Sequence, residues 1–209
     1  MSTSTAKKSK RTENAELTNR GAQRRDDLVK AALRIVVREG PSAVSLRTVA
    51  KEAAASHGLV AYYFGTRGAL MVAVVEKVCG YIATTFGAII PDLEAAASDP
   101  SRFAAVLVRY NIDHVVNHPD IGVALYEINL AAIREPELRP ALLKWGKIHA
   151  ALCRKAFVAL GSKEPEKDYA FVLHAIGGLI LGQSALPRRK FEAGIFAPAV
   201  ERLVYSILR

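Results

Sequence analysis

The sequence predicts an all-α protein, and three observations support this prediction. Apolar residues recur at spacings of three and four along most of the 209 residues, which is the period of a helix with one buried face. Alternating apolar and polar residues bounded by hairpin turns, the signal of a strand, are not found. Proline and glycine fall between the apolar stretches, where they end one helix and begin the next. With 51% hydrophobic residues, the chain can bury a sizeable core in one large or two small domains.

The first segment, residues 1–22, is polar and charged, and we expect a disordered arm because it has few side chains to bury. It contains a basic cluster of Lys7, Lys8, Lys10 and Arg11. This cluster has two interpretations: an arm that lies on DNA, or a tail that only improves solubility. The first helix is expected over residues 23–39, where Gly40 and Pro41 end it.

Residues 44–64 are predicted to form two short helices joined by a tight turn. Apolar residues on one face of the first helix are Leu46, Val49, Ala50 and Ala53. Ser45 and Ser56 are positioned to cap the two helices with their hydroxyl groups. Only Ala54 and Ala55 separate the helices, so the helices cross at a steep angle, as in a helix-turn-helix that reads DNA.

This stretch resembles the DNA-binding domain of the TetR family of bacterial transcriptional regulators, whose pattern is roughly T-x-R-x-I-A-x-x-A-G-V-S-x-G-x-L-Y-x-Y-F-x-x-K-x-x-L. Over residues 25–70 the matching positions are Ser45, Arg47, Val49, Ala50, Ala53, Ser56, Gly58, Val60, Tyr63, Phe64, Arg67 and Leu70. The resemblance implies a helix-turn-helix DNA-binding domain over residues 23–69 and a helical effector-binding and dimerisation domain over residues 70–209. It also implies a cytoplasmic repressor that a small-molecule effector releases from a palindromic DNA operator.

The chain departs from the family pattern at two positions. Ala54 replaces the glycine of the turn, so the turn either bends differently or carries about 1 kcal/mol of backbone strain. Ala61 replaces the first tyrosine of Y-x-Y-F, and the neighbouring Tyr62 is the residue available to substitute for its phosphate contact.

The predicted DNA contacts are Ser45, Arg47, Ser56, His57, Leu59, Ala61, Tyr62, Tyr63 and Arg67. The resemblance implies phosphate contacts for Ser45, Arg47, Tyr63 and Arg67, while Val60 and Phe64 are expected to face inward. Residues 56–64 contain no Arg, Lys, Asn or Gln, so bidentate contacts to base edges are absent from the second helix. Arg47 is the remaining candidate for a guanine contact, and DNA shape is expected to supplement it.

Six further helices follow from proline, glycine and capping signals. Their expected ranges are 66–88, 100–117, 120–134, 136–160, 165–185 and 193–208. The first of these joins the DNA-binding domain to the remainder of the chain. Gly68 and Gly80 within it are interpreted either as points of bending or as close packing against a neighbour.

The last two helices carry the signal for assembly. The residues assigned to a homodimer interface are Gly178, Gly182, Phe196, Val200 and Val204. Two such faces from each chain can form a four-helix bundle about a two-fold axis, and the resemblance implies this dimer. The alternative is that both helices bury their apolar faces within one chain.

The candidate effector pocket combines aromatic side chains with a few polar groups, as small-molecule sites do. Its predicted lining is Tyr110, Asn111, His114, Tyr126, Glu127, Trp145, His149, Phe171 and His174. His114 and His118 have the spacing of metal ligands, but no Cys or carboxylate accompanies them at motif spacing, and no metal or cofactor is expected.

Charge and composition restrict the partners. Residues 1–70 hold 13 Lys and Arg against 6 Asp and Glu, whereas residues 71–209 hold 16 against 14, so the positive excess lies with the DNA-reading segment. Cys79 and Cys153 are expected to be buried thiols in a reducing cytosol. Residues 170–186 are too short and too polar for a membrane span. No nucleophile or phosphate-loop motif indicates an enzyme, so the rival interpretations are an effector-independent DNA-binding protein and, less favoured, a helical enzyme.

Overall fold

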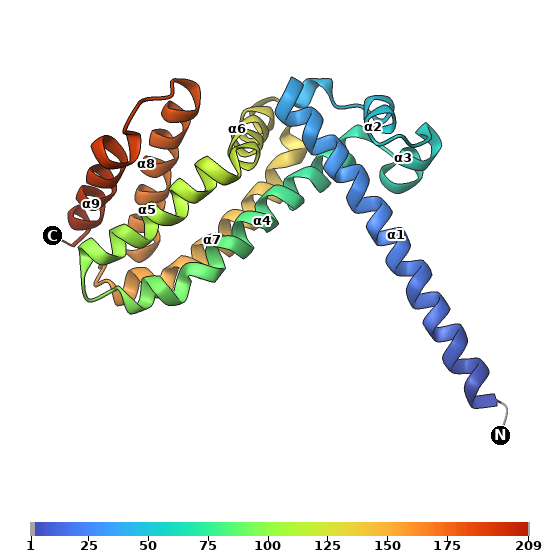
Figure 1. Cartoon of the computed structure of the whole chain (residues 1–209), viewed down its shortest axis with the longest axis horizontal. Helices are drawn as coiled ribbons and strands as arrows, with labels where there is room; N and C mark the ends of the chain where they lie inside the picture. Colours follow the sequence, from blue (N-terminus) through green and yellow to red (C-terminus); the bar gives the residue numbers. More distant parts are fainter. Residues whose placement is uncertain (1–2, 209) are drawn as a thin grey trace. The chain divides into compact units, whose positions relative to one another are not determined.

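The computed structural model describes residues 3–208, with side chains from residue 19 onward, and over this range it contains nine α-helices and no strand (Figure 1). The predicted all-α class is therefore confirmed. The chain divides into two compact units that meet between Val74 and Val75, a few residues after the boundary predicted from the sequence. Each unit is described separately below.

The first unit contains the helix-turn-helix. Its elements are α1 (Thr3–Glu39), the 3₁₀ turn η1 (Pro41–Ala43), α2 (Leu46–Glu52), α3 (His57–Phe64) and the start of α4 (Arg67–Ala95). The turn between α2 and α3 contains Ala54 and Ala55, as predicted.

Helix α1 begins earlier than the sequence predicted, because it continues from Thr3 through residues 3–22 rather than starting at residue 23. This segment contains no proline and is rich in Ala, Lys, Glu and Arg, which are good helix formers. The structure thus replaces the predicted disordered arm with helical backbone. The side chains of the basic cluster at residues 7–11 lie outside the described residues.

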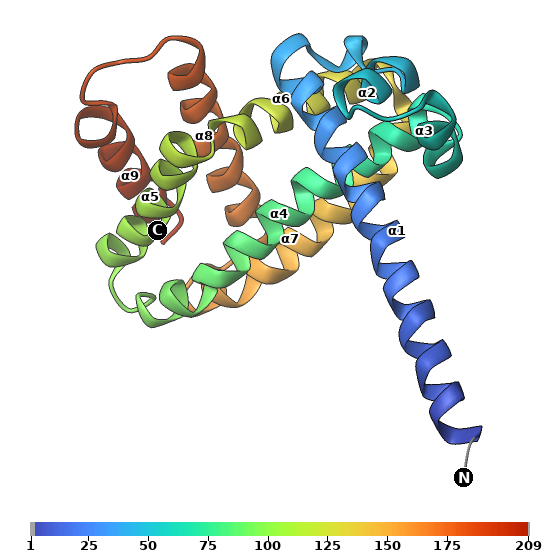
Figure 2. The ribbon, with the colours of Figure 1, turned by 45° about the vertical axis from the view of Figure 1, so that its right-hand side comes forward.

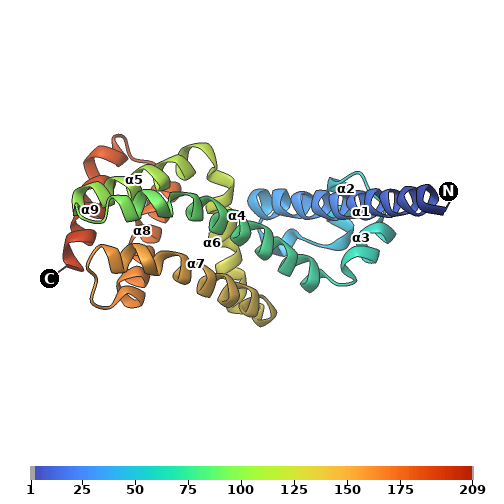
Figure 3. The same cartoon turned by 90° about the horizontal axis from the view of Figure 1, so that it is seen from below.

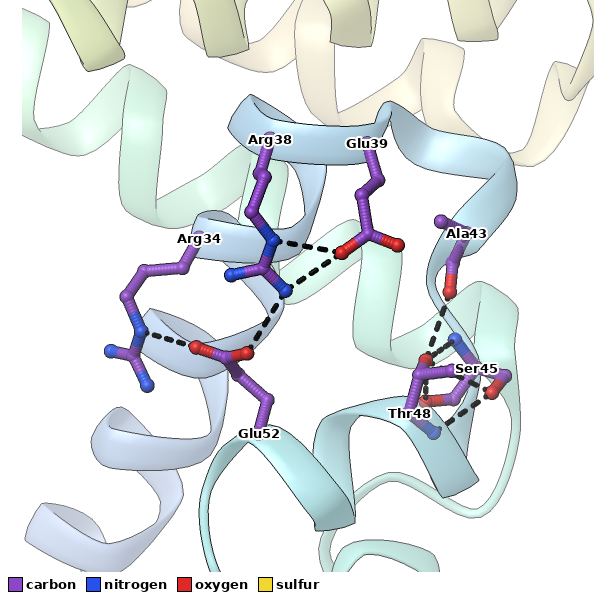
Figure 4. A network of polar contacts seen from close by, with 7 residues as sticks. All are labelled: Arg34, Arg38, Glu39, Ala43, Ser45, Thr48 and Glu52. Atoms are coloured by element: carbon purple, nitrogen blue, oxygen red, sulfur yellow. Dashed lines mark hydrogen bonds and ion pairs between the residues drawn. The ribbon is translucent and has the colours of Figure 1, made fainter.

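The core of the first unit is small and apolar. Leu28 and Val36 of α1, Val49 of α2 and Val60 of α3 are all completely buried, and Leu70 at the start of α4 closes the core. Outside this core, Glu52 at the end of α2 binds two arginines of α1 (Figure 4). The Arg34 Nε and Arg38 Nη2 atoms lie 2.8 and 3.0 Å from its carboxylate oxygens. The pKa of Glu52 is lowered by these hydrogen bonds, first from Arg34 and then from Arg38.

The second unit contains the remaining helices. They are α5 (Pro100–Asn117), α6 (Pro119–Arg134), α7 (Arg139–Ala159), α8 (Pro165–Ala185) and α9 (Ala197–Ser206), with a 3₁₀ turn η2 (Pro136–Leu138) and a π-helical turn η3 (Glu192–Phe196). Asp99 caps α5 by accepting from the backbone N–H groups of Ser101 and Arg102. Helix α5 lies beside α9, and α7 beside α8 (Figures 2 and 3).

Helix α4 continues to Ala95, beyond the expected end at residue 88, and Pro91 lies inside it. Near its middle it packs beside α7: a methyl group added at Gly80 would lie 3.4 Å from the Trp145 ring. Gly80 therefore permits close packing, which was one of its two interpretations. Of the described residues, only α4 has the length and composition to cross a membrane, a criterion that buried core helices of folded domains also meet.

Helix α9 corrects one prediction about the assembly. Phe196, Val200 and Val204, which were assigned to the dimer interface, are completely buried within the single chain. They belong to the core that includes Phe103 and Leu107 of α5. The assignment was wrong because the apolar stripe of α9 covers α5 of its own chain, and its side chains are not available to a partner.

Candidate functional site

The start of α2 is fixed by a reciprocal cap. The Ser45 hydroxyl accepts from the Thr48 backbone N–H at 3.0 Å, and the Thr48 hydroxyl accepts from the Ser45 backbone N–H at 2.8 Å (Figure 4). Thr48 also donates to the Ala43 carbonyl oxygen at 2.9 Å. This cap holds the exposed Arg47 on the first turn of the helix. Thr48 was missed from the sequence, although its spacing from Ser45 is that of a capping pair.

Arg67 has a structural role that the sequence did not predict. Its guanidinium donates to the carbonyl oxygens of Val44 at 2.9 Å and Pro41 at 2.8 Å, and the side chain is half-buried. These bonds tie the beginning of α4 to the segment that precedes α2. Two of its donors are thus directed to the protein's own backbone, and the predicted phosphate contact of Arg67 stays a prediction.

The turn between α2 and α3 contains a strained residue. Ala54 has a φ of +47°, in the left-handed region where a Cβ atom clashes with the backbone and costs about 1–2 kcal/mol. Of the two interpretations of this position, the structure supports the strained turn. The turn nevertheless forms the bond from the Ala55 N–H to the Ala50 carbonyl oxygen at 2.9 Å.

Helix α3 presents one face to its own unit and the other to solvent. Ser56 caps it by accepting from the Leu59 N–H at 3.2 Å. Val60 is completely buried and Phe64 nearly so, as predicted. Tyr62, by contrast, is 82% exposed, and it is the most exposed of the large apolar side chains described. His57 is exposed as well, so the outer face of α3 is available to a ligand.

Three other predicted DNA contacts are only partly exposed. Leu59 and Ala61 are half-buried, as is Tyr63, whose ring packs edge-on against Tyr62 with ring centres 5.3 Å apart. Tyr63 also lies close to α1, since a methyl group at Gly21 would be 3.7 Å from its hydroxyl. The hydroxyl of Tyr63 is thus held near α1.

The second unit contains a cavity of about 170 Å³. Side chains from α4, α5, α6, α7 and α8 line it. Five of the predicted effector residues are among the lining, namely Tyr110, Asn111, His114, Tyr126 and His149. The structure thus brings together Tyr110 and His149, which are 39 positions apart in the sequence.

A chain of polar groups runs along one side of this cavity. Thr85 of α4 is central to it, because its hydroxyl oxygen lies 3.2 Å from the Tyr110 hydroxyl and 3.2 Å from His114 Nε2. His114 Nδ1 donates to the Tyr110 carbonyl oxygen at 2.9 Å. On another wall, the Tyr169 hydroxyl is hydrogen-bonded to His149 Nδ1. These contacts fix the orientation of the rings that face the cavity.

Burial shifts the pKa values of several ionisable groups in the second unit toward their neutral forms. It lowers the pKa of His149 to about 4 and raises the pKa of Tyr110 to about 12. It likewise raises the pKa of Cys153 to about 12 and that of Cys79 to about 11. Both thiols are therefore protonated at neutral pH and poorly reactive.

Four predicted effector residues do not line the cavity. Phe171 is 51% exposed and His174 is also exposed, because both lie on the outward face of α8. Trp145 packs beside Gly80 of α4 instead. Glu127 follows the lining residue Tyr126 on α6 and is turned about 100° away from it around the helix. These four assignments to the lining were wrong.

Several lining residues were missed. The most important is Tyr169, and with it the buried Phe86, Val172 and Ile176. On α8 the lining follows a helical period through Tyr169, Val172, Ile176 and Ile180, a signal that the sequence did contain. Opposing apolar residues on the other face of α8 obscured that signal.

The two histidines at metal-ligand spacing serve another purpose. The rings of His114 and His118 have centres 5.8 Å apart, and both rings pack against Tyr81. Among residues 19–208 no group of three or more His, Cys, Asp or Glu side chains could hold a metal ion.

The outward face of α8 remains uncovered in the single chain. Gly178, assigned to the dimer interface, is exposed, and Gly182 is half-buried. Phe171 and Leu181 on the same face are 51% and 47% exposed. An apolar stripe of this kind on a helix surface is typical of a protein interface.

Comparison with known proteins agrees with this architecture. Residues 28–74 match the family described as "Bacterial regulatory proteins, tetR family". Residues 98–209 match the family described as "Tetracyclin repressor-like, C-terminal domain". The second match alone covers more than half of the chain.

Two curated relatives are similar to parts of the chain. The HTH-type transcriptional repressor NicS of Pseudomonas putida is 27% identical over 106 residues, which are 51% of this chain and 48% of the relative. The HTH-type transcriptional regulator BetI of Rhizobium meliloti is 28% identical over 125 residues, which are 59% of each chain. The chain thus spans about half the length of the curated relatives it matches.

Solved structures share the fold over most of the chain. A TetR-family transcriptional regulator from Mesorhizobium loti superimposes with a TM-score of 0.74 at 18% identity, covering 90% of this chain and 96% of that one. The multidrug binding protein EbrR complexed with proflavin gives a TM-score of 0.62 at 26% identity, covering 86% and 99%. From the two family matches and this common fold, the chain belongs to the TetR family of bacterial regulatory proteins.

Proposed function

We propose that this protein is a DNA-binding transcriptional regulator, a repressor that a small-molecule effector releases from a palindromic operator. The observation that carries the proposal is the outer face of α3, where Tyr62 and His57 are exposed, together with the exposed Arg47 of α2. The names of the relatives NicS and BetI, a repressor and a regulator, support it. A protein acting on DNA in this way works in the cytoplasm.

We assign the proposed DNA contacts to two roles. Ser45 and Tyr63 would bind phosphate groups, which fix the register of the protein on the duplex. Arg47 would bind the edge of a guanine, because it is the exposed guanidinium on α2. Exposed His57 and Tyr62 would contact phosphates or base edges, and Leu59 and Ala61 would touch thymine methyl groups.

Selection of operator fragments from random DNA, followed by gel-shift titration at fixed salt, tests these roles. Tyr63→Phe is expected to weaken binding to matched and mismatched operators alike, because it removes a phosphate contact. Arg47→Ala is expected to reduce the difference in binding free energy between matched and mismatched operators by about 1–3 kcal/mol. If no fragment is enriched over random DNA, the proposed function is wrong; the opposite pattern of the two variants would overturn only the assigned roles.

A homodimer would use the outward face of α8. Phe171, Gly178 and Leu181 lie at helical spacing on that face, and both apolar residues are about half exposed. Glycine at position 178 would let a partner helix approach closely. We expect Leu181→Glu to yield a monomer by light scattering and to abolish tight operator binding. Val158→Glu, at a similarly exposed position of α7, should leave both unchanged.

The effector would act through α4. This helix starts with Arg67, which holds the segment before α2, and its later residues Ile82 and Phe86 line the cavity. An effector that binds one arrangement of α4 more tightly than another would shift the protein toward that arrangement and change its operator affinity. The multidrug binding protein EbrR forms complexes with imidazole, proflavin and malachite green, which supports a small-molecule role for such a cavity.

The alternative is a DNA-binding protein without an effector. A thermal-shift screen separates the two, because a ligand that binds the folded state raises its melting temperature. An effector must raise the melting temperature and also lower operator affinity. Ligands that bind the cavity without changing operator affinity would support the alternative.

A further inference from the structure

The cavity of the second unit carries no fixed charge. Of the 21 residues that line it, none is Asp, Glu, Lys or Arg. Burial keeps His149 and Tyr110 neutral at physiological pH, since their pKa values are shifted to about 4 and about 12. The remaining histidine, His114, uses both ring nitrogens in hydrogen bonds to Tyr110 and Thr85. A charged ligand would therefore meet no counter-charge in this lining.

The volume of the cavity indicates the size of the ligand group that it can enclose. An apolar cavity of about 150 Å³ holds one benzene ring, and this cavity measures about 170 Å³. Most of its wall is aliphatic or aromatic, including Phe86, Val172 and Ile176. The space suits a single ring with a short substituent.

Within the part of the chain that the structure describes, the lining contains an unpaired hydrogen-bond acceptor on Asn111. The Tyr126 hydroxyl donates to the Gly177 carbonyl oxygen at 2.6 Å, and His149 pairs with Tyr169. Asn111 Nδ2 donates to the Leu107 carbonyl oxygen at 2.8 Å, whereas its Oδ1 atom has no hydrogen-bond partner within residues 19–208. An N–H or O–H group on the ligand would satisfy this oxygen.

We propose that the effector is a small uncharged molecule, one aromatic or alicyclic ring that carries at least one N–H or O–H group. The inference rests on the proposed function, because it takes the cavity to be the effector site. Its physical basis is that an ion transferred from water into an apolar cavity loses hydration, and only a partner of opposite charge offsets that loss. The uncharged lining supplies no such partner, so a neutral molecule of the same shape binds more tightly.

Two matched pairs of compounds test this inference on the full-length protein. Benzamide and benzoate have the same shape and differ in charge, and so do benzyl alcohol and benzylammonium. Dissociation constants measured by ligand-observed NMR at about pH 7 are expected to be at least tenfold lower for the neutral member of each pair. Each neutral compound also carries the N–H or O–H group that Asn111 Oδ1 would accept.

A pair of glycine substitutions shows whether binding occurs in the cavity. Gly122 of α6 lines the cavity between Ile121 and Leu125, and a Cβ atom there would meet nothing within 4 Å. Gly122→Leu is thus expected to occupy the space while favouring the helix, and to abolish binding. Gly146→Leu on α7 is the control, because Gly146 is equally unobstructed but lies outside the lining.

A charge introduced into the lining gives a second, independent test. Asn111→Asp places a carboxylate beside the ligand without changing the side-chain shape. The affinity of benzylammonium relative to that of benzyl alcohol is therefore expected to rise at least tenfold. Asn129→Asp is the matched control: Asn129 makes the same type of bond, to the Leu125 carbonyl oxygen at 2.7 Å, but is exposed and outside the lining. It should leave the preference unchanged.

The outcomes separate the inference from the proposed function. Charged members that bind as tightly as neutral ones, with binding abolished by Gly122→Leu, would overturn the inference and leave the effector site intact. An unaltered preference in Asn111→Asp would overturn it as well. If no compound binds, or if binding persists in Gly122→Leu, the cavity is not the ligand site, and the effector-binding part of the proposed function fails.

Discussion

The residues proposed to touch DNA and those that line the cavity are positioned in opposite ways. On α3 the side chains proposed to contact DNA point out of a small core, as with Tyr62, while Val60, two residues earlier, is buried in that core. In the second unit the lining side chains point inward from five helices, as Tyr169 and Phe86 do. A surface site of the first kind depends on a few neighbours in the sequence, whereas an internal site depends on the packing of the whole unit.

The largest expected effect comes from a substitution on the buried face of α3 rather than on its exposed face. Phe64→Ala removes a nearly buried ring and should lower the free energy of unfolding by about 3–5 kcal/mol, which abolishes DNA binding through loss of the fold. Urea denaturation followed by circular dichroism measures the change. The matched variant Tyr62→Ala should cost less than about 0.5 kcal/mol and still weaken operator binding. Equal losses of stability would contradict the assigned orientation of α3.

Arg67 provides the next test, since the structure assigns it to the protein's own backbone. Arg67→Met removes two charged hydrogen bonds, to Val44 and Pro41, and is expected to destabilise the first unit by about 2 kcal/mol. Arg47→Met should leave stability unchanged, because Arg47 is exposed, while it lowers operator affinity. If Arg67→Met kept full stability and lost only DNA affinity, the predicted phosphate contact would be supported instead.

Acid should act on the second unit through His149. Its pKa is lowered by burial to about 4, while in the unfolded chain it is about 6.5. Between these values the unfolded state binds the proton first, so stability is present above about pH 6.5 and falls as the pH decreases, by at most about 1.4 kcal/mol per pH unit.

Measuring the free energy of unfolding of the wild type and of His149→Gln from pH 7 to pH 5 isolates this contribution. The variant should lose the part of the pH dependence that His149 causes. The exposed His174→Gln variant should retain it. The same slope in all three proteins would show that His149 is not responsible.

The smallest expected effect concerns the turn of the first unit. Ala54→Gly relieves the strain of a left-handed alanine but adds freedom to the unfolded chain, so a net stabilisation of up to about 1 kcal/mol is expected. Ala55→Gly is the control. Because Ala55 has no positive φ, this substitution relieves no strain and should slightly destabilise the protein. The change in melting temperature measures both variants, and destabilisation by Ala54→Gly would contradict the strained conformation.

The difference between the two regions also explains how far the sequence could predict them. Capping by Ser45 and Ser56, the inward Val60 and Phe64, and the bounds of α5 and α8 follow from local signals, and the structure agrees with them. The continuation of α4 past Pro91 was not predicted, because packing along the helix outweighs the local preference of proline.

The lining of the cavity was harder to predict, for a specific reason. Helix α8 is apolar on both sides: Tyr169 and Val172 face the cavity, while Phe171 and Leu181 face outward. Periodicity alone cannot tell which side is internal. Helix α9 shows the same ambiguity, since its apolar stripe fits a dimer interface as well as the surface of α5 that it actually covers.

The burial of α9 has a consequence for how the regulator responds to its own abundance. Phe196, Val200 and Val204 are enclosed within one chain, so they need no second copy to cover them. In the proposed homodimer, reversible pairing of finished monomers would make the fraction of paired molecules rise with expression level. Occupancy of a two-half-site operator would then grow roughly as the square of the copy number at low expression, giving the regulated gene a threshold rather than a graded response.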